Sequence, residues 1–302
     1  MNYARNYFLG FSIDKDLDFQ ELQEFYLTWR NFIEYIVLQK QTDNLRMKGN
    51  VDLETFAVKC SKRGNDVYWC RVKQRLNSFK GLKDHALFDP RTNIKLANVL
   101  FVTLTYDIKR STIREAWETI GKDFNKWIRN LRKKFGHISY LRCWEASRRG
   151  YPHIHVLMIF RDYEFKVKRI KGKYRVIEKE AFEKSYHSFV DVLAIREIKK
   201  GIRYVTKYLT KLKNENHTQT LTLSLCWLFR KRTFAISGEF HKLIVIKTKS
   251  SILVQVDLQG VEIRLKVEYV FIGIFSAKRL GIDRNEWWKV ITDKEVLRDI
   301  MS

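Results

Sequence analysis

Apolar residues recur along the whole chain, and the period of their recurrence marks the expected elements. Residues 18–40 carry apolar side chains every three or four positions, which predicts one amphipathic helix with Asp18 and Glu21 as its capping box. Residues 60–76 are polar and basic and predict a loop followed by a helix, and Asp89-Pro90 predicts a turn. Together they indicate a helical, basic accessory region over residues 1–95.

The pattern changes at Val99, where a β-branched and aromatic run predicts a buried strand. Thr112 and Glu115 then open a helix with the spacing of a capping box. Two strands follow over residues 137–146 and 153–160, then a helix over 178–189, a strand over 188–198 and a helix after Gly201. This order is typical of a split βαβ, ferredoxin-like sandwich with a central antiparallel sheet, which we assign to residues 96–240.

Beyond residue 240 the apolar period is two, which predicts strands with one wet face. Gln259-Gly260 is a predicted hairpin turn, and Thr292 to Glu295 is a predicted cap for a final short helix. Residues 241–302 are therefore expected to form a β-rich region that ends in a helix. The predicted fold class for the whole chain is α+β.

Charge narrows the function. The chain has 58 Lys and Arg against 34 acids, a formal net charge of +24, which attracts polyanions, most commonly nucleic acid. A membrane surface or a simple solvated face would carry the same excess. The uncharged run from Asn216 to Phe229 is shorter than the roughly 20 residues that a spanning helix needs. The first residues have no long apolar segment and the four cysteines form no C-x-x-C pair, so the host cell cytoplasm is expected.

A pair of histidines in the second predicted strand indicates a metal site. His153 and His155 leave the same face of a strand, and a turn centred on Arg149 would set Glu145 opposite His153 on that face. A carboxylate and two imidazoles suit Mn²⁺ or Mg²⁺ and leave positions for substrate oxygens and water. The alternative interpretation is a pair of hydrogen-bonded structural histidines.

Two tyrosines in the last predicted helix of this region form the second candidate group. Tyr204 and Tyr208 are one helical turn apart, and Lys207 and Lys211 each follow a tyrosine by three positions. A phenol is a poor nucleophile at its free pKa of about 10, and nearby lysines could favour phenolate or hold a phosphate. The alternative is that the rings pack and the lysines extend into solvent.

The order FVTLTYD, WEASRRGYPHIHVLMIF, YVTKYLTK resembles the three motifs of the HUH endonucleases. It is most similar to rolling-circle replication initiators of the two-tyrosine, bacteriophage gene A type, over residues 98–212. The resemblance implies a ferredoxin-like nuclease domain with the metal on its sheet and the tyrosine helix alongside. It implies that Glu145, His153 and His155 bind the metal, that Tyr204 and Tyr208 are paired nucleophiles, and that Lys207 and Lys211 are the motif's lysines.

The resemblance also implies a reaction. A tyrosine cuts single-stranded origin DNA, keeps a 5′-phosphotyrosyl link, releases a free 3′-hydroxyl, and later rejoins strands. Tyr208 is our primary nucleophile, because single-tyrosine relatives keep a tyrosine immediately after the corresponding lysine, and Tyr204 is the opposite assignment. A host polymerase would extend the 3′-hydroxyl. A host helicase is expected as a partner, because the chain has no phosphate-binding G-x-x-x-x-G-K-[ST] loop.

Residues 126–149 hold eight Lys or Arg and one acid, which predicts a DNA-facing rim formed by a helix end and the following hairpin loop. The predicted DNA contacts are Lys133, Lys134, Arg142, Arg148 and Arg149. Three other functions stay open: a relaxase or transposase with the same chemistry, a non-enzymatic nucleic-acid binder on a ferredoxin-like scaffold, and a metallohydrolase with histidine ligands.

Overall fold

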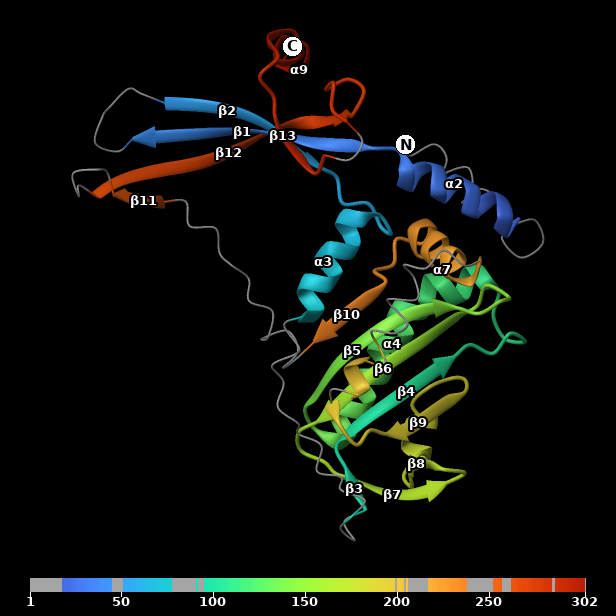
Figure 1. Ribbon diagram of the computed structural model, residues 1–302. Coiled ribbons are helices and arrows are strands. Elements are labelled where there is room, and N and C mark those ends of the chain that lie inside the picture. The colour runs from blue at the N-terminus through green and yellow to red at the C-terminus, as the bar shows by residue number, and fades with distance from the viewer. Residues whose placement is uncertain are drawn as a thin grey trace. The chain divides into compact units, whose positions relative to one another are not determined.

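The computed structural model describes residues 18–44, 51–77, 91, 95–198, 200–203, 205, 217–237, 252–256, 262–283 and 286–301 (Figure 1). The chain divides into two compact units: unit 1 takes Met1–Leu27 and Arg71–Val245, and unit 2 takes Thr28–Cys70 and Ile246–Ser302. This division differs from the three consecutive segments that the sequence pattern suggests. The reason is that strands from both ends of the chain share the sheet of unit 2, a non-local pairing that periodicity does not encode.

Unit 1 is built on an antiparallel sheet of eight strands in the order β10-β5-β6-β4-β9-β8-β7-β3. Antiparallel sheets combined with helices agree with the predicted α+β class. The hairpin of β7 and β8 was absent from the predicted order. The strands are β3 Leu96–Ala97, β4 Val99–Thr105, β5 Ile138–Ala146, β6 Pro152–Phe160, β7 Phe165–Ile170, β8 Lys173–Val176, β9 Val190–Ala194 and β10 Phe234–Ser237.

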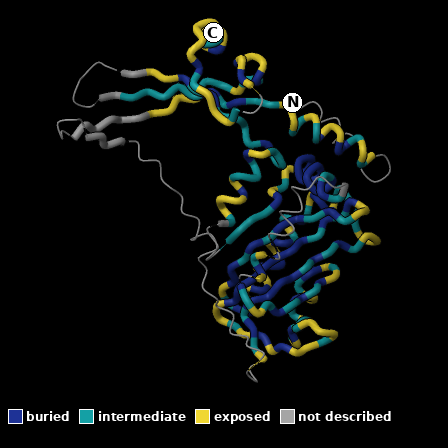
Figure 2. Tube along the Cα trace, in the orientation of Figure 1, coloured by how far each residue is buried: buried dark blue, intermediate teal, exposed yellow. Residues whose placement is uncertain are grey.

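Helix α4 (Ile113–Phe135) packs on one face of this sheet, against β5 and β6. The predicted capping box is confirmed: Glu115 N donates to Thr112 Oγ1 at 3.2 Å, and Thr112 N donates to Glu115 Oε2 at 2.9 Å. We call this side of the sheet the α4 face. Its interior is dense with rings, and the strands beneath the helix are largely buried (Figure 2). The buried side chains of α4 are Ala116, Trp117, Ile120, Phe124, Trp127, Ile128, Leu131 and Phe135.

The opposite side of the sheet, which we call the histidine face, carries the alternate residues of each strand, His153 and His155 among them. The helix predicted after Gly201 begins at residue 198, and its described residues are 198, 200–203 and 205. Gly201 sits on this face, so close that a Cβ there would come within 2.6 Å of Leu157 Cδ1. Its backbone approach to β6 therefore requires a residue without a side chain.

Two other helices of unit 1 differ from the predicted pattern. The helix expected over residues 178–189 is only α5 (Glu180–Glu183). The apolar stretch weighed as a membrane segment is α7 (His217–Leu228), which packs against β5. Among the described residues no helix is long and apolar enough to cross a membrane.

Unit 2 holds an antiparallel sheet in the order β11-β12-β1-β2-β13. The helix predicted over residues 18–40 was wrong in its second half, because α2 ends at Asn31 and β1 begins at Glu34. Tyr-Ile-Val-Leu at 35–38 favours a strand, and β1 pairs on both sides. The strands are β1 Glu34–Asn44, β2 Val51–Lys59, β11 Ile252–Val256, β12 Glu262–Ser276 and β13 Trp288–Val290.

The remaining helices are α3 (Asp66–Asn77), which confirms the helix predicted in that stretch, and α9 (Lys294–Met301). Asp293 caps α9 in place of the predicted Thr292, since Asp293 Oδ1 accepts from Glu295 N at 2.8 Å and from Val296 N at 3.2 Å. The predicted turns at Asp89-Pro90 and Gln259-Gly260 lie outside the described residues.

Candidate active site

The β5–β6 hairpin sets the geometry of the predicted metal ligands. Glu145 on β5 lies directly opposite His153 on β6, which confirms the register expected from the short turn. In that turn Gly150 N donates to Ser147 O at 2.9 Å, and Ser147 N donates to Tyr151 O at 2.8 Å. Gly150 has φ +83°, a conformation that favours glycine and fixes the length of the turn. The turn therefore decides which carboxylate faces the histidines.

His155 is held on both of its nitrogens. Its Nε2 lies 2.8 Å from Glu145 Oε2, and its Nδ1 lies 3.3 Å from Thr103 Oγ1 on β4. The imidazole also stacks on Phe101, with ring centroids 5.9 Å apart and planes 15° apart. The side chain of His155 is buried. A hydroxyl on one nitrogen and a carboxylate on the other fix the ring's orientation, as the surroundings of metal-binding histidines commonly do.

His153 lies one row further along the same face, between Glu145 on β5 and Thr105 on β4. Burial lowers the pKa of His153 below its ordinary value, and nearby His155 lowers it further, while Glu145 acts in the opposite direction. A neutral imidazole at neutral pH follows, and this is the form that can bind a metal ion.

These side chains fit a divalent ion in donor type and in face. Their ligand atoms are not all close enough to one point to bind an ion: the described residues hold no group of three or more His, Cys, Asp or Glu side chains placed to hold a metal ion. The hydrogen bond between Glu145 and His155 joins two of the three expected ligand atoms to each other. Both side chains would have to turn toward a common centre beside His153 to form the site.

The predicted DNA-facing rim is wrong as a single surface. Arg148 and Arg149 are exposed in the β5–β6 turn, whereas Lys133 and Lys134 are exposed in the last turn of α4. The chain enters β5 just after α4 ends and reaches the turn only after the nine residues of β5. At about 3.4 Å per residue, the two basic clusters lie roughly 25 Å apart. Of the five predicted DNA contacts, Arg148 and Arg149 are the ones at the end of the sheet that carries Glu145 and His153.

Arg142 is not with the exposed basic residues either. Its guanidinium carbon lies 3.6 Å from the centroid of the Trp144 ring and 5.2 Å from that of Phe124, on the α4 face. Burial lowers the pKa of Arg142 to about 10. The side chain is thus part of the interior between α4 and β5.

The loop between β4 and α4 supplies basic residues that the sequence analysis did not single out. Tyr151 Oη donates to Ser111 O at 2.9 Å and Trp117 Nε1 donates to Gly150 O at 2.7 Å, which fasten this loop and α4 to the β5–β6 turn. Lys109 and Arg110 are exposed in the loop. They lie at the same end of the sheet as the turn, and their signal in the sequence was the basic pair that closely follows FVTLTYD.

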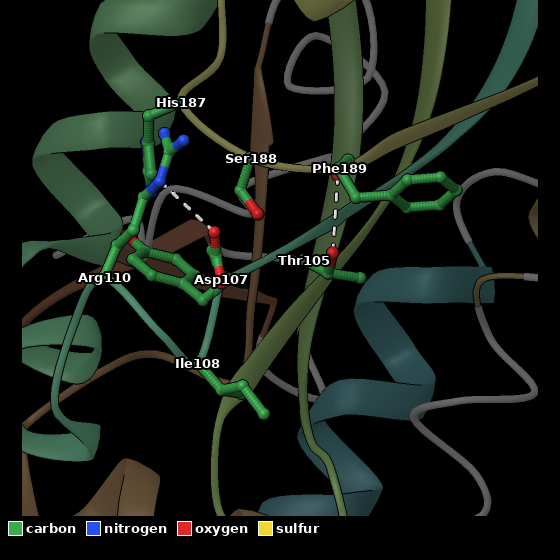
Figure 3. Close-up of a pocket in the computed structure, with 8 residues that line it drawn as sticks. Thr105, Asp107, Ile108, Arg110, His187, Ser188 and Phe189 are labelled. Atoms are coloured by element: carbon green, nitrogen blue, oxygen red, sulfur yellow. Dashed lines mark hydrogen bonds and ion pairs between the residues drawn. The ribbon is translucent and has the colours of Figure 1, made fainter.

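A polar pocket opens at this end of β4 (Figure 3). Arg110 Nε lies 3.3 Å from Asp107 Oδ2 in its wall, and Asp107 Oδ1 accepts from Lys109 N at 3.0 Å. Figure 3 shows that the Phe189 ring points away from Asp107, Arg110 and His187. The lining residues are Thr105, Tyr106, Asp107, Ile108, Arg110, His187, Ser188 and Phe189.

The tyrosine motif is the remaining part of the predicted site. Tyr204, Lys207, Tyr208 and Lys211 all lie outside the described residues.

Comparison with known proteins places the same part of the chain in a replication context. Residues 99–213 match the family model of the replication-associated protein ORF2. The match covers less than half of the chain and spans β4, the histidine pair and the tyrosine motif. No curated protein and no solved structure matches the chain. The family match supports a rolling-circle replication initiator family and a role in the initiation of replication.

Proposed function

We propose that this chain is a metal-dependent nickase of single-stranded DNA that starts rolling-circle replication and rejoins the strands at termination. The observation that carries the proposal is the cross-strand placement of Glu145 opposite His153, with Glu145 bonded to His155 on the same face. The family match over residues 99–213 supports the same function. The finer assignment, a two-tyrosine HUH endonuclease, is part of this proposal.

Glu145, His153 and His155 would hold one Mn²⁺ or Mg²⁺. Bound there, the ion would supply a positive charge that polarises a non-bridging oxygen of the scissile phosphate. Thr103 orients His155 through its Nδ1. Arg148 and Arg149, in the adjacent turn, would hold the flanking phosphates of the strand.

The nucleophile in this proposal is a tyrosine of the YVTKYLTK motif, with Tyr208 as the primary choice and Tyr204 as its alternate. The phenolic oxygen forms a bond to phosphorus, the bond from phosphorus to the 3′ oxygen breaks, and the phenol's proton ends on the released 3′-hydroxyl. The 5′-phosphotyrosyl link keeps the energy of the phosphodiester, so a later 3′-hydroxyl can reverse the step. Lys207 and Lys211 would stabilise the phenolate or the phosphate.

The fold supports the proposal in one further way. Four consecutive neighbours in the large sheet, β5-β6-β4-β9, have the order of a split βαβ sandwich when α4 and α5 are taken as its two helices. We propose that this is the ferredoxin-like core of the nuclease. Single-stranded origin DNA, a host helicase and a host polymerase would be its partners, in the cytoplasm of the host cell.

The test is a covalent adduct assay. The full chain is incubated with Mn²⁺ and single-stranded oligonucleotides from the DNA that flanks its coding sequence, and products are separated on a denaturing gel. We expect an adduct with the unmodified protein. We expect none with the His153→Ala, His155→Ala double variant.

The tyrosine variants decide the chemistry. Tyr204→Phe and Tyr208→Phe separately identify the first nucleophile, and the double variant should form no adduct. Adducts that survive the double change would remove both tyrosines from the mechanism. Tyr174→Phe, a change on β8 outside the motif, is the matched control and should leave the adduct intact.

A further inference from the structure

Phe189 is a large apolar side chain that the fold leaves in solvent. It precedes β9 and has 60% of its surface exposed, while its neighbour Val190 is fully buried. Thr105 N donates to Phe189 O at 3.1 Å, so the backbone that carries the ring is tied to β4. Phenylalanine is among the residues most often buried, and an exposed ring on a fixed backbone is an observation that the core does not explain.

The register places this ring in the row of the proposed metal ligands. Leu104 pairs with Val190, so Thr105 lies opposite Phe189, as the hydrogen bond between them also indicates. Thr105 pairs in turn with His153, and His153 pairs with Glu145. Residues opposite one another in antiparallel strands share a face, so Phe189 projects on the histidine face. With strands about 4.8 Å apart, Phe189 lies two strands and roughly 10 Å from His153.

One cation lies beside the ring. Lys179 Nζ lies 5.4 Å from the centroid of the Phe189 ring and also forms an ion pair with Glu183. A flat aromatic surface beside an ammonium group suits a nucleotide, because the base can stack on the ring while the cation attracts a phosphate. An apolar peptide would gain nothing from the ammonium group.

We propose that Phe189 is a stacking platform for a nucleobase of the single-stranded DNA, about one nucleotide away from the scissile phosphate, which would lie at the metal ion that Glu145, His153 and His155 would hold. This inference rests on the proposed function and adds to it a base contact outside the metal site and outside the tyrosine motif. Stacking on a benzene ring is available to every base, so the contact positions the strand and does not read its sequence.

The experiment measures binding without chemistry. Fluorescence anisotropy of labelled (dT)25 and of an abasic phosphodiester strand of equal length is recorded in EDTA at fixed salt, for the full chain. The unmodified protein should bind (dT)25 more tightly than the abasic strand. Phe189→Ala should weaken binding of (dT)25 about fivefold or more and leave the abasic strand unchanged.

Three further variants separate stacking from other effects. Phe189→Leu keeps apolar bulk and should lose nearly as much affinity as the alanine variant, whereas Phe189→Trp should restore it. Phe271→Ala removes an equally exposed phenylalanine, also 60%, from β12 of unit 2 and should change neither affinity. Equal losses on both strands, equal losses with Phe271→Ala, or no loss with Phe189→Ala would each overturn the inference.

The outcome is distinguishable from failure of the proposed function. Binding in EDTA does not depend on the metal or on the tyrosines. A chain that forms no adduct with Mn²⁺ but still loses base-dependent affinity in Phe189→Ala would sink the nickase and keep the platform. A chain that forms the adduct but binds (dT)25 and abasic DNA with equal affinity would support the nickase and contradict the stacking platform.

Discussion

The two faces of the large sheet in unit 1 are built from the same strands and differ most at the end of the sheet near the β5–β6 turn. The α4 face is filled by packed aromatic rings. The ring centroids of Phe124 and Trp144 are 6.0 Å apart, as are those of Phe135 and Phe160, and in each pair the ring planes are nearly perpendicular. At this end the histidine face presents a carboxylate, two imidazoles and two threonine hydroxyls, with an exposed phenylalanine in the outermost row, and further along the same strands it buries Phe101, Leu141 and Leu157. The proposed chemistry is therefore confined to one end of one face, while buried apolar side chains on both faces stabilise the sheet.

Polar groups on the α4 face also serve structure. Tyr106 Oη donates to Asp123 Oδ2 at 2.5 Å and lies 3.4 Å from Thr119 Oγ1 of the same helix. Trp127 Nε1 donates to Phe182 O at 3.2 Å. These contacts join α4 to the sheet and to α5. Changes on the α4 face should act on unfolding, and changes at the polar end of the histidine face should act on adduct formation or DNA binding.

The largest effect is expected for Glu145→Gln. The change removes the only carboxylate among the three proposed ligands, and metal catalysis contributes several kcal/mol to such reactions, so adduct formation should slow about 1000-fold or more. The midpoint of thermal unfolding should stay nearly unchanged, because Glu145 is only part-buried. The measurements are single-turnover adduct kinetics in Mn²⁺ and thermal unfolding of the same samples. Unchanged kinetics would remove Glu145 from the site.

Trp127→Ala should lower the unfolding free energy and leave the rate of adduct formation nearly unchanged. The indole is fully buried on the inner side of α4, and truncation of such a side chain costs about 3–5 kcal/mol of unfolding free energy. The rate of adduct formation should be retained at temperatures where the variant is folded. Urea unfolding followed by circular dichroism measures the first quantity, and the adduct assay at low temperature measures the second. A stable but inactive variant would contradict the division between the faces.

Tyr106→Phe tests the polar contact on the α4 face. The phenol donates to a carboxylate, so its loss should cost about 2 kcal/mol. Burial, nearby Tyr186 and the Asp123 contact raise the pKa of Tyr106 above its ordinary value. A raised pKa means that the phenol's contribution is complete below the unfolded value of about 10 and is lost as pH rises further. Urea unfolding at neutral and alkaline pH should therefore show a difference in unfolding free energy between the unmodified protein and Tyr106→Phe, and this difference should become smaller above about pH 10.

The sequence predicted which side chains share a face of this sheet better than it predicted the elements around the sheet. Period-two alternation and a short turn were enough to place Glu145 across from His153, because register follows from turn length. Thr112 and Glu115 located the start of α4 for the same local reason. By contrast, β1 continues the apolar run of α2, and its pairing with β2 and β12 adds to the local strand preference of residues 35–38 in a way that periodicity does not show.

The basic rim failed as a prediction for a related reason. Lys133 and Arg148 are close in sequence, but a full strand runs between them and carries them to opposite ends of the sheet. Phe189 lies where the helix predicted over residues 178–189 overlaps the strand predicted over residues 188–198. Its exposure depends on tertiary packing, which hydrophobic periodicity does not report.

The smallest effect is expected on DNA affinity, when exposed cations are removed from either end of the sheet. Arg148→Ser with Arg149→Ser removes two cations beside Glu145, whereas Lys133→Ser with Lys134→Ser removes two exposed cations about 25 Å away. The first pair should weaken binding of (dT)25 about tenfold, and its slope of log affinity against log salt should fall by about 1.4, close to two phosphate contacts on a single strand. The second pair should weaken binding less than about twofold at the same salt, because charges beyond a Debye length are largely screened. Equal effects at both ends would mean that DNA follows the whole length of β5.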